Sequence, residues 1–204
     1  MKTLLTKLKQ NVQQLLTFEA RTAYRLGLTP NMITAIGLAF AFLSAFAYAK
    51  WQYHPIVPWL AFILLLLSGF CDALDGVVAR IYGESTVFGG FLDSLLDRYA
   101  DAAVFMGIII AVLCDYRAGM LAMIGSLLVS YSRARAEAAG LKLESVGMVE
   151  RAERMLILLL TTFIAVYWLP ALNIGVIIIA VLANVTVVQR AAYVYVKTKR
   201  KKSV

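Results

Sequence analysis

The sequence contains only two cysteines, Cys71 and Cys114, and each lies at the end of an apolar segment. A disulfide framework or a four-ligand zinc site needs further partners at matching spacing, so the sequence argues against both. Free cysteines in apolar surroundings usually behave as small packing residues. We therefore expect both side chains to be buried in the core.

Charge is also scarce, because 16% of the chain is charged and 61% is hydrophobic. Apolar runs such as 56–70 and 155–169 are too hydrophobic for a soluble domain of 204 residues. Six helices of about 20 residues would use about 120 residues and leave no room for a separate soluble domain. The chain is therefore predicted to be one domain that lies in a lipid bilayer.

Apolar runs separated by short polar breaks predict an all-α integral membrane fold with a bundle of six transmembrane helices. The expected spans are 33–50, 56–78, 91–113, 118–136, 154–169 and 171–195. The corresponding domains are an N-terminal helix at 1–28, a membrane domain at 29–196 and a basic tail at 197–204.

The N-terminal segment has apolar residues at helical spacing opposite basic and polar ones. These apolar residues are Leu5, Leu8, Val12 and Leu15. The pattern is typical of an amphipathic helix in the membrane interface, although a helix packed on the domain fits it equally well. The first 25 residues lack a short apolar core with a small-residue cleavage site, so we expect no removable signal peptide.

The 20 lysines and arginines are unevenly distributed among the loops, and only Lys50 and Arg117 fall on the side opposite to the rest. By the positive-inside rule, both termini and the second and fourth loops face the cytoplasm. The KTKRKK tail at 197–202 is then a signal for orientation and for anionic lipid, not a nucleic-acid patch. We expect a multi-pass protein of the cell membrane.

Five acidic residues fall inside the expected spans, namely Asp72, Asp75, Asp93, Asp97 and Asp101. A charge at the centre of a membrane helix costs roughly 2.5 to 3.5 kcal/mol, so five such residues need compensation. Asp72 and Asp75 are three residues apart and share one helix face, as do Asp93 and Asp97, which are four apart. Antiparallel neighbouring helices would bring all four together, where cations must offset their repulsion. Oxygen ligands favour Mg²⁺, Mn²⁺ or Ca²⁺ over zinc.

The stretch that begins at Asp72 reads DALDGVVAR, and after eight residues the chain continues with GGFLDSLLD, which ends at Asp97. This pattern resembles the signature of the CDP-alcohol phosphotransferases, DxxDGxxAR followed by GxxxDxxxD, at every fixed position. The resemblance implies an enzyme that transfers a phosphatidyl or archaetidyl group from CDP-diacylglycerol or CDP-archaeol to a second alcohol and releases CMP. It also implies a homodimer.

Such a transfer needs charge neutralised on both the attacking and the leaving oxygen, which two Mg²⁺ ions, or Mn²⁺ in their place, can do. The resemblance implies Asp72, Asp75 and Asp93 as the principal ligands. Asp97 would share metal binding with the role of general base. The implied CDP-lipid contacts are Asn31, Thr34, Asp72, Gly76, Ala79, Arg80 and Thr86. The segment around Asn31 could instead be a simple helix start, capped by Thr29 or Asn31. Arg80 could instead serve only to orient the protein in the membrane.

Arginines at the cytoplasmic ends of the last three spans exceed what orientation requires, and arginine suits a phosphate dianion. The acceptor is therefore expected to carry a phosphate. The segments SYSRARAE at 130–137, ERAER at 150–154 and QR at 189–190 resemble the branch of the family that transfers to inositol phosphate. The implied acceptor-phosphate residues are Ser130, Arg133, Arg135, Arg151, Arg154 and Arg190.

The same charged residues also fit different roles. Three glutamates, Glu137, Glu150 and Glu153, could pair with the arginines as surface ion pairs. Glycerol 3-phosphate is the rival acceptor, and an ion transporter with intramembrane carboxylates is a rival of a different class. Asp101 lies outside the signature. It could hold an arginine such as Arg98, Arg133 or Arg135, or support the metal ligands from outside.

Overall fold

The computed structural model describes residues 16–143 and 146–201, which form seven helices and no strand. The helices are α2 (Thr17–Arg25), α3 (Pro30–Ala49), α4 (Val57–Tyr82), α5 (Val87–Ile110), α6 (Tyr116–Ala138), α7 (Arg151–Ala165) and α8 (Pro170–Lys201). The predicted all-α class is confirmed. Helices α3 to α8 coincide with the six apolar runs, with bounds that differ by a few residues. The four apolar residues of the predicted N-terminal helix lie outside the described part of the chain.

Three helices are long and apolar enough to cross a membrane, namely α3, α4 and the 170–199 portion of α8. The other long helices are more polar or shorter. Helix α5 carries three aspartates, α6 carries arginines near its end, and α7 has 15 residues. Helix α4 has the length and hydropathy of a membrane span although it also carries two of the signature aspartates, Asp72 and Asp75.

Polar residues define where the helices begin and end. The hydroxyl of Thr29 accepts a hydrogen bond from the Met32 N–H at 3.3 Å, and Pro30 occupies the first helical position of α3. Thr29, not Asn31, is therefore the cap of this helix. The hydroxyl of Thr86 accepts from the Gly89 N–H at 2.9 Å and starts α5 in the same way.

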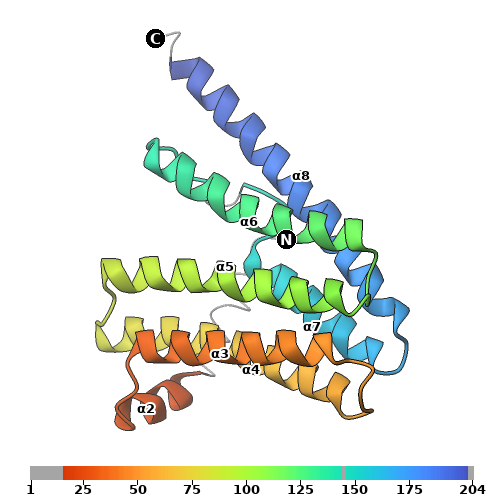
Figure 1. Ribbon diagram of the computed structural model, residues 1–204. Coiled ribbons are helices and arrows are strands. Elements are labelled where there is room, and N and C mark those ends of the chain that lie inside the picture. The colour runs from red at the N-terminus through yellow and green to blue at the C-terminus, as the bar shows by residue number, and fades with distance from the viewer. Residues whose placement is uncertain (1–15, 144–145, 202–204) are drawn as a thin grey trace.

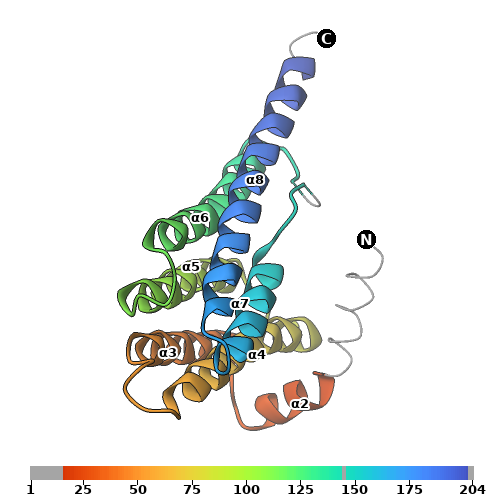
Figure 2. The ribbon, with the colours of Figure 1, turned by 90° about the vertical axis from the view of Figure 1, so that its right-hand side faces the viewer.

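Helix α3 is the common packing partner of α4 and α5, and α6 packs against α8 (Figure 1). Helix α7 contacts both α4 and α8 and so joins the two groups, as the rotated view shows (Figure 2). The last turns of α8 extend beyond the other helices towards the C-terminus. The basic residues from Lys197 to Lys201 continue this helix.

Two glycines allow the close approach of α3 to its neighbours. A Cβ atom at Gly107 would overlap the backbone carbonyl of Ala45 across the α3–α5 contact. A Cβ at Gly37 would lie 2.9 Å from the Cβ of Cys71 across the α3–α4 contact. Cys71 and Cys114 are both buried free thiols, as expected for packing residues. The bundle depends on small side chains at these crossings.

We predict that Gly107→Ala lowers the thermal stability of the purified protein, because the Ala45 backbone cannot move aside without separating α3 from α5. Overpacking of this kind costs about 1 to 3 kcal/mol. The matched control is Gly90→Ala in the same helix, where an added Cβ meets nothing within 4 Å. Thermal melting in detergent should rank Gly107→Ala below both wild type and the control. Equal melting temperatures for the two variants would contradict this account of the contact.

Candidate active site

Three of the four signature aspartates converge between α4 and α5. Carboxylate oxygens of Asp72, Asp93 and Asp97 lie within 4.8 Å of one another, and we call these three residues the aspartate cluster. Asp72 is contributed by α4, whereas the other two lie one turn apart on α5. The two helix faces therefore meet at these residues, as the sequence predicts. The two helices are held together mainly through α3, which packs against both of them.

The fourth signature residue, Asp75, is more deeply placed than the cluster. Its side chain is 6% exposed, and its Oδ2 atom accepts a hydrogen bond from the Thr34 hydroxyl at 2.7 Å. Thr34 also donates to the Pro30 carbonyl in its own helix at 3.0 Å. Helix α3 thereby fixes the orientation of Asp75. A small pocket joins these groups and is lined by Thr34, Ser68, Asp72, Asp75, Asp97 and Arg151.

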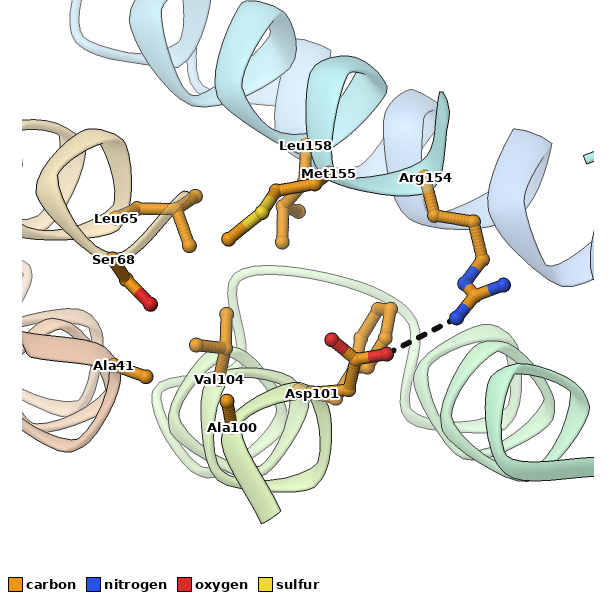
Figure 3. Close-up of a pocket in the computed structure, with 10 residues that line it drawn as sticks. Ala41, Leu65, Ser68, Ala100, Asp101, Val104, Arg154, Met155 and Leu158 are labelled. Carbon is orange, nitrogen blue, oxygen red and sulfur yellow. Dashed lines mark hydrogen bonds and ion pairs between the residues drawn. The ribbon is translucent and has the colours of Figure 1, made fainter. Parts of the chain in front are cut away.

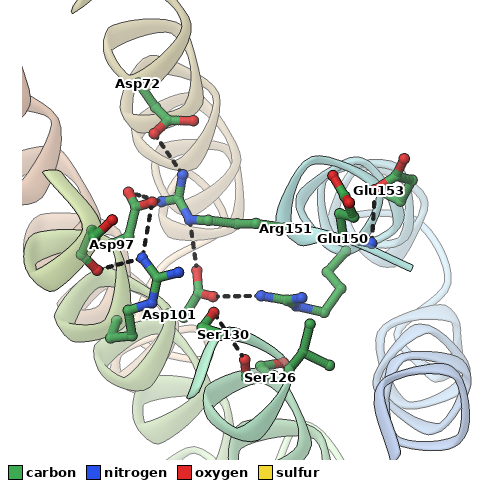
Figure 4. A network of polar contacts seen from close by, with 12 residues as sticks. Asp72, Asp97, Asp101, Ser126, Ser130, Glu150, Arg151 and Glu153 are labelled. Carbon is green, nitrogen blue, oxygen red and sulfur yellow. Dashed lines mark hydrogen bonds and ion pairs between the residues drawn. The ribbon is translucent and has the colours of Figure 1, made fainter. Parts of the chain in front are cut away.

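The first residue of α7 reaches into the aspartate cluster (Figure 4). Nη1 of Arg151 lies 2.7 Å from Oδ1 of Asp72, and Nη2 lies 3.0 Å from Oδ1 of Asp97. Its Nε atom lies 3.4 Å from Oδ1 of Asp101. One arginine therefore joins α7 to carboxylates of both α4 and α5, which offsets part of the repulsion among the carboxylates.

Asp101 pairs with two arginines of α7 that approach it from another part of the chain. Nη2 of Arg154 lies 3.1 Å from Oδ2 of Asp101, in addition to the Arg151 contact. Of the two roles considered for Asp101, holding an arginine is the one that these contacts match, through residues at the start of α7. The Asp101–Arg154 pair lines a second pocket, whose other walls are mainly apolar residues such as Leu65, Val104 and Leu158 (Figure 3).

The remaining CDP-lipid candidates gather around the start of α5 and the end of α4. The Asn31 Oδ1 atom lies 3.1 Å from the position that a Cβ on Gly89 would take, beside the Thr86 hydroxyl. The Arg80 guanidinium folds back over Gly76, where an added Cβ would lie 3.4 Å from its Nη1. The carbonyl of Ala79 accepts the Glu84 N–H at 3.0 Å. The glycines therefore leave backbone accessible next to polar side chains.

The six acceptor-phosphate candidates do not all face the aspartate cluster. Arg151 does, and Arg154 binds the neighbouring Asp101, whereas Arg190 is 2% exposed and donates to the carbonyls of Val146 at 2.9 Å and Val129 at 2.5 Å. Ser130 donates to the Ser126 carbonyl at 3.5 Å. Arg151 and Arg154 therefore lie at the aspartates, whereas Arg190 connects α8 to the segment before α7.

The last two candidates lie on the exposed side of α6. Arg135 is exposed, and Arg133 forms a 2.9 Å ion pair with Glu137 one turn later. Surface pairing therefore explains one of the six candidates. Glu150 and Glu153 form a capping box at the start of α7, where the Glu150 N–H donates to Oε2 of Glu153 at 2.9 Å. Oε1 of Glu150 also lies 4.0 Å from Nη2 of Arg190.

The aspartate cluster fits a divalent metal ion. Oδ1 of Asp93 is buried without a hydrogen-bond partner among the described residues, which is costly for a carboxylate oxygen unless a cation meets it. Three carboxylates offer the hard oxygen donors that Mg²⁺ and Mn²⁺ prefer. The side chain of Asp72 is 36% exposed, so the cluster is open to solvent on one side.

Sequence reasoning noted Asp101 but did not include it among the site residues. The signal was present, because Asp101 is a fifth costly carboxylate one turn beyond Asp97 on the same helix face. Its partners could not be read from spacing, since Arg151 and Arg154 approach from a distant part of the chain.

Comparison with known proteins gives consistent matches. Residues 27–192 match the family model described as CDP-alcohol phosphatidyltransferase. The archaetidylinositol phosphate synthase of Pyrococcus horikoshii is 39% identical over 197 residues, which cover 97% of this chain and 98% of the relative.

Solved structures of the phosphatidylinositol phosphate synthase of Mycobacterium tuberculosis, at 32% identity, have the same fold. The complex with manganese and citrate has a TM-score of 0.77 and covers 88% of each chain. The complex with CDP-DAG has a TM-score of 0.76 and covers 89% of this chain and 94% of the other.

We predict that Asp93→Asn weakens Mn²⁺ binding by about tenfold or more, because the cluster loses one anionic ligand and an amide ligates a hard cation less strongly. Electron paramagnetic resonance of free Mn²⁺ during a titration would measure this change. Glu137→Gln is the control, since its carboxylate is exposed and pairs with Arg133 outside the cluster. Unchanged Mn²⁺ affinity in Asp93→Asn would exclude Asp93 as a ligand.

Proposed function

The chain belongs to the CDP-alcohol phosphatidyltransferase family, and we propose that it transfers the phosphatidyl or archaetidyl group of a CDP-lipid to inositol phosphate with release of CMP. The observation that carries this proposal is the position of two arginines of α7, because Arg151 contacts the signature residue Asp72 and Arg154 binds the adjacent Asp101. The names of the relatives support the same acceptor. Membership of an enzyme family also makes the transporter hypothesis unnecessary.

The reaction is a displacement at phosphorus. A hydroxyl oxygen of the acceptor bonds to the phosphorus that carries the lipid alcohol, while the bond from this phosphorus to the CMP oxygen breaks. We propose that Asp97 takes the proton of the attacking hydroxyl. Bound Mg²⁺ or Mn²⁺, two ions in the proposed site, would neutralise charge on the attacking and leaving oxygens. Asp72, Asp75, Asp93 and Asp97 would hold them.

The CDP-lipid is proposed to lie along the end of α4 and the start of α5. Arg80 can pair with a pyrophosphate through its fork of N–H groups, and Gly76 leaves room beside it. Asn31 and Thr86 flank the same region from α3 and α5. Thr34 acts through Asp75, which it orients by a hydrogen bond. Ala79 lies three residues after Gly76 and so on the same face of α4.

The acceptor phosphate is proposed to bind on the side of α7. Arg151 and Arg154 point towards the aspartates, so a phosphate held there would place the hydroxyls of the same small molecule near Asp97. Ser130 and Arg135 on α6 are further candidates. Arg190 would contribute by holding the segment before α7, given its bonds to Val129 and Val146.

We also propose that all six helices from α3 to α8 cross the membrane, with the site and both termini on the cytoplasmic side. The excess of lysine and arginine on this side supports the orientation. Helix α7 is about 22 Å long at 1.5 Å per residue, which is short for a full crossing. It packs against α4 and α8. The homodimer implied by the family stays a prediction.

We predict that the purified protein with a CDP-lipid and Mg²⁺ releases CMP with inositol phosphate and not with free inositol. The reason is that free inositol lacks the phosphate that the two arginines of α7 are proposed to bind. A panel that also contains glycerol 3-phosphate separates the rival acceptors. Turnover with glycerol 3-phosphate but not with inositol phosphate would reject the proposed acceptor and retain the family chemistry.

We predict that Asp97→Asn lowers the rate of CMP release by about 10²-fold or more, because both proton acceptance and a metal ligand are lost. Glu84→Gln, in the loop between α4 and α5, is the matched control and should retain wild-type turnover. Thermal melting would establish that both variants are folded. Turnover of folded Asp97→Asn within a few-fold of wild type would argue against this role.

A further inference from the structure

The guanidinium of Arg151 binds carboxylate oxygens that would otherwise be free to bind a metal ion. Its Nη atoms lie 2.7 Å from Asp72 and 3.0 Å from Asp97, and both of these residues belong to the aspartate cluster. Its Nε atom faces Asp101, which lies outside the cluster. The Arg151 side chain is 15% exposed, so water screens these contacts poorly. Arg151 therefore supplies positive charge at the place where the family chemistry requires a divalent cation.

We propose that Arg151 is the counter-cation of the aspartate cluster in the metal-free protein, and that it turns from Asp72 and Asp97 towards the acceptor phosphate when divalent metal binds. This inference rests on the proposed function, because it needs both a metal and a phosphorylated acceptor at this site. An arginine and a divalent cation compete for the same oxygens and repel each other at this range. The aspartate cluster thus exchanges one cation for another.

Asp101 provides the position to which Arg151 retreats. It binds Arg154 through Oδ2 and faces Arg151 through Oδ1, and neither contact uses an oxygen of the aspartate cluster. When Arg151 leaves Asp72 and Asp97, the Asp101 contact through Nε can persist while both Nη groups are freed. Two Nη groups form the fork that matches a phosphate dianion. Asp101 is therefore a positioning residue for the acceptor site.

The exchange requires movement of a side chain and not of a helix. The backbone at Arg151 is held by the capping box, in which the Glu150 N–H donates to Oε2 of Glu153 at 2.9 Å. The Arg154 guanidinium, one turn later, stays on Asp101. In this scheme metal and acceptor phosphate favour each other's binding, because each stabilises the same released position of Arg151. Such coupling is reciprocal between the two ligands.

The experiment measures Mn²⁺ affinity of the purified full chain in detergent, by paramagnetic resonance of free Mn²⁺, with and without inositol phosphate. CDP-lipid is omitted so that no turnover occurs. In the wild type, saturating inositol phosphate should tighten Mn²⁺ binding by about fivefold or more. Arg151→Gln should bind Mn²⁺ about tenfold more tightly than wild type in the absence of inositol phosphate, and should lose the effect of inositol phosphate.

Arg154→Gln is the matched control, because it removes the same charge from Asp101 without touching Asp72 or Asp97. Its Mn²⁺ affinity without inositol phosphate should stay within about threefold of wild type, below the range of a specific coupling. Equal tightening in both variants would indicate a general charge effect and overturn the proposal. Unchanged or weaker Mn²⁺ binding in Arg151→Gln would also overturn it.

The wild-type measurement decides the case even if Arg151→Gln does not fold. A wild type that releases CMP with inositol phosphate but whose Mn²⁺ affinity is insensitive to inositol phosphate overturns this inference and leaves the proposed function in place. Failure of the proposed function alone would give a different result. Tight Mn²⁺ binding by Arg151→Gln, without CMP release by the wild type, would support the counter-cation and reject the proposed acceptor.

Discussion

The repulsion among carboxylates inside an apolar helix bundle is the constraint to which the other features of the site respond. Asp72, Asp93 and Asp97 hold their oxygens within 4.8 Å of one another. Like charges this close in a medium of low polarity destabilise the fold unless cations lie among them. Arg151 is such a cation, and it is delivered by a helix distant in the sequence. The packing of α7 therefore affects the electrostatics of the aspartates directly, because α7 supplies their counter-charge.

The aspartates are carried by helices that α3 holds in place, and their counter-charge lies on the long side chain of Arg151. Helix α3 packs on both α4 and α5 through glycine crossings at Gly37 and Gly107, so the backbones that carry the aspartates have little freedom. Asp75 is fixed further by Thr34. The long side chain of Arg151 has many rotamers and starts from a capped helix end. Rigid anions and an adaptable cation suit the proposed replacement of Arg151 by a metal ion at the aspartate cluster.

The positive groups of the chain divide into three physical roles. The arginines at the aspartates face carboxylates on other helices, whereas Arg133 pairs with Glu137 on its own helix. Arg190 is buried and satisfies two backbone carbonyls. These residues are of the same type, yet their surroundings differ. The role of each arginine follows from what lies within reach of its guanidinium.

The sequence alone predicted the helices, the family and the aspartates that are proposed to carry the chemistry. Hydrophobic runs and the three- and four-residue spacing of Asp72, Asp75, Asp93 and Asp97 are local properties, and local spacing sets which residues share a helix face. Only the tertiary structure decided that Thr34 orients Asp75, that Arg151 enters the cluster, and that Asp101 binds Arg154. These contacts join residues far apart in the chain. They depend on how α7 packs against α4 and on the direction of long side chains, which no spacing within a single helix specifies.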